Sequence, residues 1–146
     1  MEPKRILFVC VENACRSQIA EAFARHYGKG RVAAFSAGSR PRGQVDAGAV
    51  AVMRERGLDL SRQNSKGLTE LPSVTWDAVV TMGCGDACPN VPAKHRLDWQ
   101  VPDPARQPPE VYRQVRDVID GAVKMLLGRL GLPAQGPQGQ AGVPLD

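Results

Sequence analysis

The sequence has few aromatic residues, few cysteines and no long run of apolar residues. Phe, Trp and Tyr make up 5% of the 146 residues, so aliphatic side chains must fill most of the core. No segment approaches the roughly 20 consecutive apolar residues that a membrane-spanning helix needs. The apolar run at residues 6–11 is too short for the core of a secretory signal. We therefore expect a soluble protein of the cytoplasm with no membrane partner.

The rest of the composition is that of an ordinary globular domain. The chain is 42% hydrophobic and 23% charged, which provides enough apolar material for a packed core. Its net charge of +4 suits an anionic ligand but is too small and too dispersed to indicate nucleic-acid binding. We expect residues 1–130 to form a single domain. Residues 131–146 are rich in Gly, Pro and Gln and are predicted to be a mobile tail.

Continuous apolar runs alternate with amphipathic segments, and this alternation predicts an α/β fold. The predicted strands are residues 4–10, 31–37, 76–82 and, shorter, 95–99. The predicted helices are residues 17–28, 46–57 and 110–130, with one or two further helical turns at 65–71. The expected core face of the last helix consists of Val111, Val115, Val118, Ala122 and Leu126. We expect a three-layer domain: a four-stranded parallel sheet in the flavodoxin-like order 2-1-3-4, with helices on both faces.

The four cysteines form two close pairs, Cys10 with Cys15 and Cys84 with Cys88. A disulfide within either pair would close a very short ring and constrain little of the unfolded chain. Ligands of parallel α/β sheets bind beyond the carboxyl ends of the strands. Cys10 ends the first predicted strand and Cys84 follows the third, so both thiols are expected at that edge. The pairs are therefore predicted to be reactive thiols or metal ligands.

The segment from Cys10 to Ser17 leads directly from a predicted strand into a predicted helix. A loop of this length can surround a tetrahedral oxyanion with backbone N–H groups, at the positive end of the helix dipole. These groups and Arg16 favour the thiolate of Cys10, and the guanidinium matches two oxygens of phosphate or arsenate. Ser17 can donate to the Cys10 sulfur, and Asn13 can hold the loop's shape. The predicted anion-binding residues are Val11, Glu12, Asn13, Ala14, Cys15, Arg16 and Ser17.

This loop, together with Asp103-Pro104 later in the chain, resembles the low-molecular-weight protein tyrosine phosphatase superfamily over residues 4 to about 130. The resemblance implies that Cys10 is the nucleophile, that Arg16 binds the oxyanion and that Asp103 is the general acid. One loop position departs from the pattern, because Glu12 stands where the phosphatases commonly have glycine. A carboxylate there would repel an oxyanion unless it turned to solvent.

The segment Met-Gly-Cys-Gly-Asp-Ala-Cys-Pro at residues 82–89 resembles the redox loop of the thioredoxin-coupled arsenate reductases, which share the phosphatase fold. Ala105 and Arg106 also replace the aromatic pair that usually follows the phosphatase Asp-Pro. The resemblance implies reduction of arsenate to arsenite, with Cys10, Cys84 and Cys88 as a thiol–disulfide relay. Thioredoxin or another external thiol would supply the electrons. Cys15 remains either a structural or protective thiol or a redox one.

Other functions stay open at this point. A tyrosine phosphatase would use the same loop, and a non-catalytic thiol sensor or oxyanion-binding module would need only its binding properties. Zinc at Cys84 and Cys88 is disfavoured by their spacing and by the lack of further ligands, so no metal cofactor is expected. The family resemblance does suggest a potassium site in some members. Asn13, Glu21 and Ser36 match its pattern, whereas Ser65 stands where a carboxylate is expected.

Overall fold

The computed structural model describes residues 2–83 and 90–132. The strands are β1 (Lys4–Cys10), β2 (Val32–Gly38), β3 (Trp76–Thr81) and β4 (Ala93–Asp98). The helices are α1 (Arg16–Gly28), α2 (Ala47–Arg54) and α3 (Pro109–Arg129), with a short 3-10 helix η1 (Leu68–Glu70). Cys84, Cys88 and residues 133–146 of the predicted tail lie outside the described residues. Within the described ranges, no helix is both long enough and apolar enough to cross a membrane.

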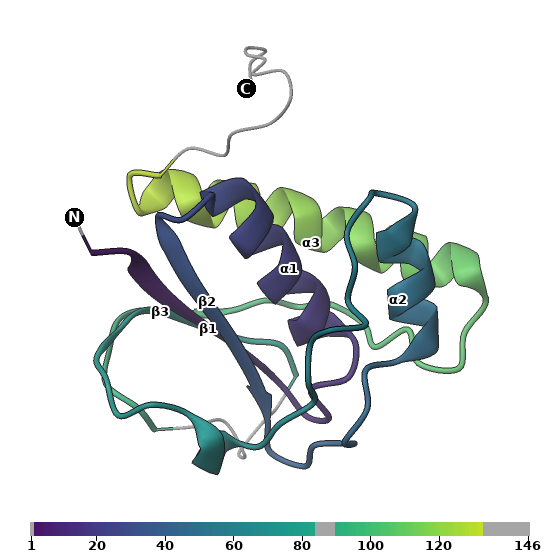
Figure 1. The fold of residues 1–146 in the computed structure, drawn as a ribbon, viewed down its shortest axis with the longest axis horizontal. Helices are drawn as coiled ribbons and strands as arrows, with labels where there is room; N and C mark the ends of the chain where they lie inside the picture. The colour runs from purple at the N-terminus through teal and green to yellow at the C-terminus, as the bar shows by residue number, and fades with distance from the viewer. Residues whose placement is uncertain (1, 84–89, 133–146) are drawn as a thin grey trace.

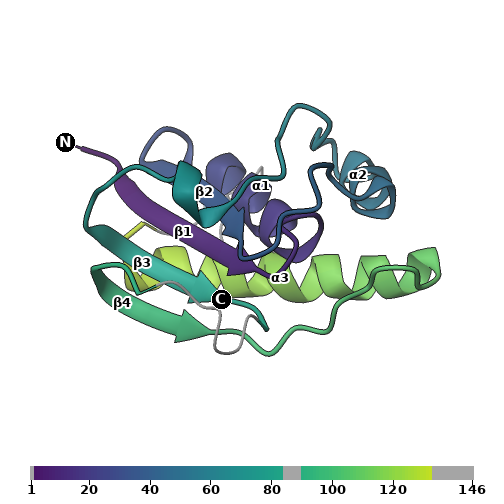
Figure 2. The same cartoon turned by 90° about the horizontal axis from the view of Figure 1, so that it is seen from below.

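The sheet confirms the predicted topology. Its four strands are parallel and lie in the order β2-β1-β3-β4, and the arrowheads of β1, β3 and β4 point the same way in Figure 2. Cys10 of β1 pairs with Gly38 of β2, and Val9 pairs with Thr81 of β3. Thr81 pairs in turn with Asp98 of β4. The carboxyl ends of the strands therefore meet at one edge of the sheet, and Cys10 lies there.

β1 is buried on both faces, which accounts for its continuous apolar sequence. Ile6 and Phe8 belong to the larger core, which also contains residues of all three α-helices, whereas Leu7 and Val9 belong to a smaller cluster. α1 and α3 lie side by side over one face, and α2 packs against α3 (Figure 1). Leu68 of η1 and apolar residues of the neighbouring loops pack against the smaller cluster. In the described chain, the three α-helices therefore contribute to the core on the face of Ile6 and Phe8, whereas η1 and loops cover the face of Leu7 and Val9.

The helix ends follow local signals, although α2 ends at Arg54 and not at the predicted residue 57. Asp46 caps α2, because its side chain accepts a hydrogen bond from Gly48 N at 2.8 Å. Gly28 is the last residue of α1, and Lys29 adopts the left-handed backbone that ends the helix (φ 47°). A Cβ at Gly28 would lie 2.5 Å from Val32 Cγ2, so close packing requires this glycine. At residues 65–71, the expected turns reduce to the three residues of η1.

The core face of α3 is only partly the predicted one, because Val111 and Ala122 are half-buried. Val115 and Leu126 are buried as expected, but Val118 is 55% exposed. The buried apolar residues are Tyr112, Val115, Ile119, Val123, Leu126 and Leu127. Apolar side chains occur on more than one side of this helix, so their spacing alone did not select the buried stripe.

Candidate active site

The loop between β1 and α1 begins at Cys10, the last residue of β1, and α1 starts at Arg16. No side chain caps the amino end of α1, and its first turn contains no acidic residue. The first backbone N–H groups of a helix have no partner within the helix and carry its positive partial charge. The amino end of α1 can therefore donate hydrogen bonds to an anion held in the loop and stabilise its charge.

Cys10 is almost fully buried, and its sulfur is hydrogen-bonded to Ser17. The Cys10 Sγ–Ser17 Oγ distance is 2.9 Å, and Asn13 Nδ2 donates to the same Ser17 oxygen at 2.8 Å. Because Ser17 Oγ accepts from Asn13, its own proton is free to point toward Cys10. Ser17 is therefore placed to donate a hydrogen bond to the Cys10 sulfur.

Asn13 fixes the shape of the loop. Its backbone lies in the left-handed region (φ 48°), which Asn tolerates better than most residues do. Its side-chain oxygen accepts hydrogen bonds from Gln18 Nε2 at 3.0 Å and from Lys66 N at 2.8 Å. The loop also lies directly against the end of β2, because a Cβ at Gly38 would be 2.5 Å from Val11 O. The hydrogen bonds of the Asn13 side chain thus support its predicted role of holding the shape of the loop.

Arg16 connects the loop to the segment that follows β4. Its Nη1 donates to Val101 O at 3.0 Å, and its Nη2 lies 3.9 Å from Asp103 Oδ2. The Arg16 side chain is 10% exposed, whereas that of Asp103 is 49% exposed. The Asp103 carboxylate also accepts from Ala105 N at 3.1 Å, which holds the turn. Residues 87 positions apart in the sequence are therefore brought to one small pocket, which is lined by Cys10, Glu12, Ala14, Cys15, Arg16, Arg42 and Asp103.

Arg42 is the residue of this pocket that the sequence analysis missed. Its Nε and Nη2 donate to Glu12 Oε1 at 3.1 and 2.7 Å, and its Nη1 lies 3.7 Å from Asp46 Oδ2. The Glu12 carboxylate is half exposed and paired with a cation. This pairing reduces the repulsion that the Glu12 carboxylate, at the third loop position, would exert on an oxyanion. The available signal was that Arg42 follows the second predicted strand, at the carboxyl edge of the sheet.

The two described cysteines lie in different electrostatic surroundings. Burial raises the pKa of the Cys15 thiol far above its ordinary value, and the negative charges of Asp46 and Asp103 raise it further. Cys15 is therefore a neutral thiol near neutral pH and a poor nucleophile. Its surroundings favour the structural or protective role over the redox one.

The predicted redox segment can be followed only as far as Gly83. Met82 N donates to Val9 O at 2.8 Å, so the chain leaves β3 beside the end of β1. A Cβ at Gly83 would lie 3.0 Å from Arg16 Nη1. The described chain thus reaches the pocket one residue before Cys84. Within residues 2–83 and 90–132, no cluster of three or more His, Cys, Asp or Glu side chains could hold a metal ion.

The chain is similar to proteins of one family over most of its length. The family model described as low molecular weight phosphotyrosine protein phosphatase matches residues 5–135. A glutaredoxin arsenate reductase of Synechocystis sp. is 36% identical over 130 residues, covering 87% of this chain and 98% of that protein.

Solved structures give the same result. An arsenate reductase in the phosphate binding state matches with a TM-score of 0.78 and 35% identity, covering 86% of this chain and 98% of that one. A thioredoxin-dependent arsenate reductase of Corynebacterium glutamicum matches with a TM-score of 0.75 and 35% identity, covering 90% of this chain and 63% of that one. The similarity is therefore one of overall fold as well as of local sequence.

Proposed function

The chain belongs to the low molecular weight phosphotyrosine protein phosphatase family, and we propose that within this family it is an arsenate reductase. The observation that carries the proposal is the placement of Cys10. Its buried sulfur is hydrogen-bonded to Ser17 at the amino end of α1. The chain also matches proteins named arsenate reductases over almost the whole length of those proteins. The same names support an oxyanion ligand and a thiol partner, and a reductase of this kind would act in the reducing cytoplasm.

The first step is attack of the Cys10 thiolate on arsenic. A sulfur–arsenic bond forms, and one arsenate oxygen leaves as water after Asp103 supplies a proton. Arg16 and the backbone N–H groups of the loop stabilise the negative charge on the remaining oxygens. Asp103 suits the role of acid because it is half exposed, and so can be reprotonated from solvent, and because it lines the pocket.

The second step reduces arsenic with electrons from thiols. Cys84 attacks the Cys10 sulfur, a Cys10–Cys84 disulfide forms, and arsenic leaves as arsenite with the electron pair of the broken sulfur–arsenic bond. Cys88 then attacks Cys84, frees Cys10 and leaves a Cys84–Cys88 disulfide for an external reductant. The position of Gly83 beside Arg16 supports this assignment, since Cys84 is the next residue.

The proposal is tested first at Cys10. We expect Cys10→Ser to lower arsenate-dependent arsenite release by at least about a thousandfold, because the hydroxyl is a far weaker nucleophile than the thiolate. Cys15→Ala is the matched control: it removes a neighbouring buried thiol and should keep activity within about one order of magnitude. Appreciable turnover by Cys10→Ser would remove the mechanism altogether.

The relay is tested by two further variants, each given one equivalent of arsenate and analysed by mass mapping of disulfides. Cys84→Ser should release little arsenite, because nothing attacks the blocked Cys10. Cys88→Ser should release one equivalent and trap a Cys10–Cys84 disulfide. Both should fail in multiple turnover with thioredoxin or glutaredoxin as donor. Full single-turnover yield from Cys84→Ser would exclude Cys84 as the attacking thiol.

A tyrosine phosphatase is the second candidate, favoured by the pairing of Cys10, Arg16 and Asp103 in one pocket. Steady-state assays of the wild-type protein separate the functions. Arsenate-dependent oxidation of a thiol system supports the reductase, hydrolysis of an aryl phosphate without it supports the phosphatase, and the absence of both supports a sensor or oxyanion-binding module.

A further inference from the structure

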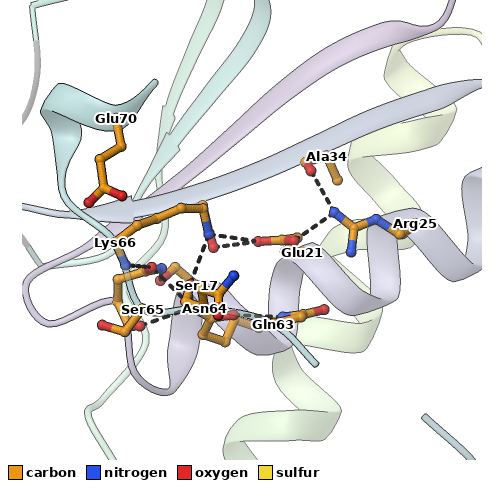
Figure 3. Close-up of polar contacts among 12 residues, drawn as sticks. Ser17, Glu21, Arg25, Ala34, Gln63, Asn64, Ser65, Lys66 and Glu70 are labelled. Carbon is orange, nitrogen blue, oxygen red and sulfur yellow. Dashed lines mark hydrogen bonds and ion pairs between the residues drawn. The ribbon is translucent and has the colours of Figure 1, made fainter. Parts of the chain in front are cut away.

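The residues suggested for a potassium ion lie behind the anion loop, around the buried carboxylate of Glu21. Ser36 Oγ donates to Glu21 Oε1, and Arg25 Nη2 lies 2.6 Å from Glu21 Oε2. Lys66 Nζ lies 3.8 Å from Glu21 Oε1. Figure 3 shows Glu21 between Arg25 on one side and Lys66 on the other. One buried negative charge is thus already matched by two cationic side chains of the protein.

The oxygen atoms around Glu21 accept hydrogen bonds from protein donors. Lys66 Nζ donates to Asn64 O at 2.9 Å, and Arg25 Nη2 donates to Ala34 O at 2.9 Å. The side-chain oxygen of Asn13 already accepts two hydrogen bonds, from Gln18 Nε2 and Lys66 N. An amide oxygen has two lone pairs, so none is left for a metal ion. The residues present therefore do not fit a potassium ion.

Charge leads to the same conclusion. Glu21 is the carboxylate that pairs with both Arg25 and Lys66, so a potassium ion added beside these two cations would bring three positive charges to the one negative charge of Glu21. The repulsion between unit charges a few ångströms apart is substantial in a partly buried site. Ser65, at the position expected to hold a second carboxylate, is neutral and donates its hydroxyl to Glu12 O at 3.0 Å.

We propose that Lys66 is a built-in cation that replaces potassium beside the anion loop. Its ammonium group neutralises Glu21, and its backbone N–H holds the Asn13 side chain. Asn13 donates to Ser17, and Ser17 is hydrogen-bonded to the Cys10 sulfur. Lys66 is thus a positioning residue whose contacts extend from Glu21 to the nucleophile. The protein, unlike potassium-binding members of its family, keeps its loop in shape without a monovalent ion.

The test removes the ammonium group and keeps the backbone. Lys66→Met preserves the hydrogen bond to Asn13 but leaves Glu21 and Asn64 O open to an external cation. Melting temperatures are measured in KCl, NaCl and choline chloride at equal ionic strength. Lys94→Met is the control: Lys94 also pairs with a carboxylate, Asp77 at 3.5 Å, but it extends from β4 and is 65% exposed.

We expect wild type and Lys94→Met to melt at the same temperature in KCl as in NaCl. In choline chloride, Lys66→Met should melt at a lower temperature than wild type. KCl should raise the melting temperature of this variant by about 2–4 °C, whereas NaCl should not. The rate at which iodoacetamide alkylates Cys10 at a fixed pH, followed by mass spectrometry, should respond to potassium but not to sodium in Lys66→Met. A loss of packing alone would not respond to the identity of the cation.

Two results would overturn the proposal. The first is a wild-type protein that melts at a higher temperature in KCl than in NaCl, because Lys66 would then leave room for the ion; this measurement stands even if the variant fails to fold. The second is a folded Lys66→Met with no preference for potassium. Both readouts are independent of arsenate. The inference rests on the proposed function only in predicting that potassium restores kcat/KM for arsenate in Lys66→Met, so failure of the function leaves the thermal test intact.

Discussion

At the scale of single residues, the pocket depends on how each charge near the oxyanion is compensated. Arg16 lines the pocket, and its guanidinium donates to Val101 O and lies near Asp103. Glu12 carries the opposite charge at the same pocket, but Arg42 pairs with it. The loop therefore tolerates a carboxylate at its third position, because an arginine from a different segment neutralises it.

This pairing predicts the effect of removing Arg42. Arg42→Ala should weaken binding of phosphate or arsenate by about two- to fivefold, since a partly exposed ion pair contributes up to about 1 kcal/mol and its loss frees a repelling carboxylate. Isothermal titration with phosphate measures the change. The double variant Glu12→Gln/Arg42→Ala should regain wild-type affinity. If it binds as weakly as Arg42→Ala alone, then Arg42 contacts the anion itself and the explanation fails.

The site could be predicted from the sequence where its members are neighbours along the chain. Cys10, Asn13, Arg16 and Ser17 lie within eight residues, so a strand followed by a helix already places them together. Arg42 and Lys66 were missed because long loops bring them to the pocket and to Glu21. The position of Arg42 after the second predicted strand was the available signal for it, whereas no local pattern distinguishes Lys66 from other cationic residues. Cys84 and Cys88 remain predictions.

At the scale of elements, strands were predicted more accurately than helix faces. β1 and β3 are buried on both faces, so every apolar residue in them supports the assignment. The same logic was only partly right for α3, where Val115 and Leu126 are buried but Val118 is exposed. Contacts with the rest of the fold decide the face. Tyr112 is an example, because its hydroxyl donates to Asp46 Oδ2 at 2.9 Å and joins α3 to the cap of α2.

The corrected face of α3 predicts unequal effects at adjacent positions. Ile119→Ala should lower the free energy of unfolding by about 2–5 kcal/mol, because Ile119 is fully buried in the main core and its truncation leaves a cavity. Val118→Ala should change it by no more than about 0.5 kcal/mol, because Val118 is exposed. Urea denaturation followed by circular dichroism compares the two. Equal losses at both positions would mean that the helix is rotated from the face described.

At the scale of the whole molecule, the anion site joins segments that are far apart in the chain. Cys10 ends β1, Arg16 begins α1, and Asp103 follows β4, so a bound oxyanion would be shared by all three. A ligand that binds only the folded state stabilises the entire domain in proportion to the logarithm of its concentration over Kd. The stability of the protein should therefore report on the site even without catalysis.

The final prediction uses this coupling. Phosphate at 100 times its Kd should stabilise the wild-type protein by about 2.7 kcal/mol, which corresponds to a rise in melting temperature of at least several degrees for a domain of this size. Arg16→Ala should lose most of that rise at the same phosphate concentration, because it removes the guanidinium that can bind two anion oxygens. Arg5→Ala is the matched control, since it removes the same charge near the amino end of β1, at the opposite edge of the sheet from Cys10. It should keep the full phosphate-dependent rise, which separates a site-specific effect from a general response to net charge. Differential scanning calorimetry over a phosphate series measures all three proteins, and an unchanged rise in Arg16→Ala would show that the anion is held without Arg16.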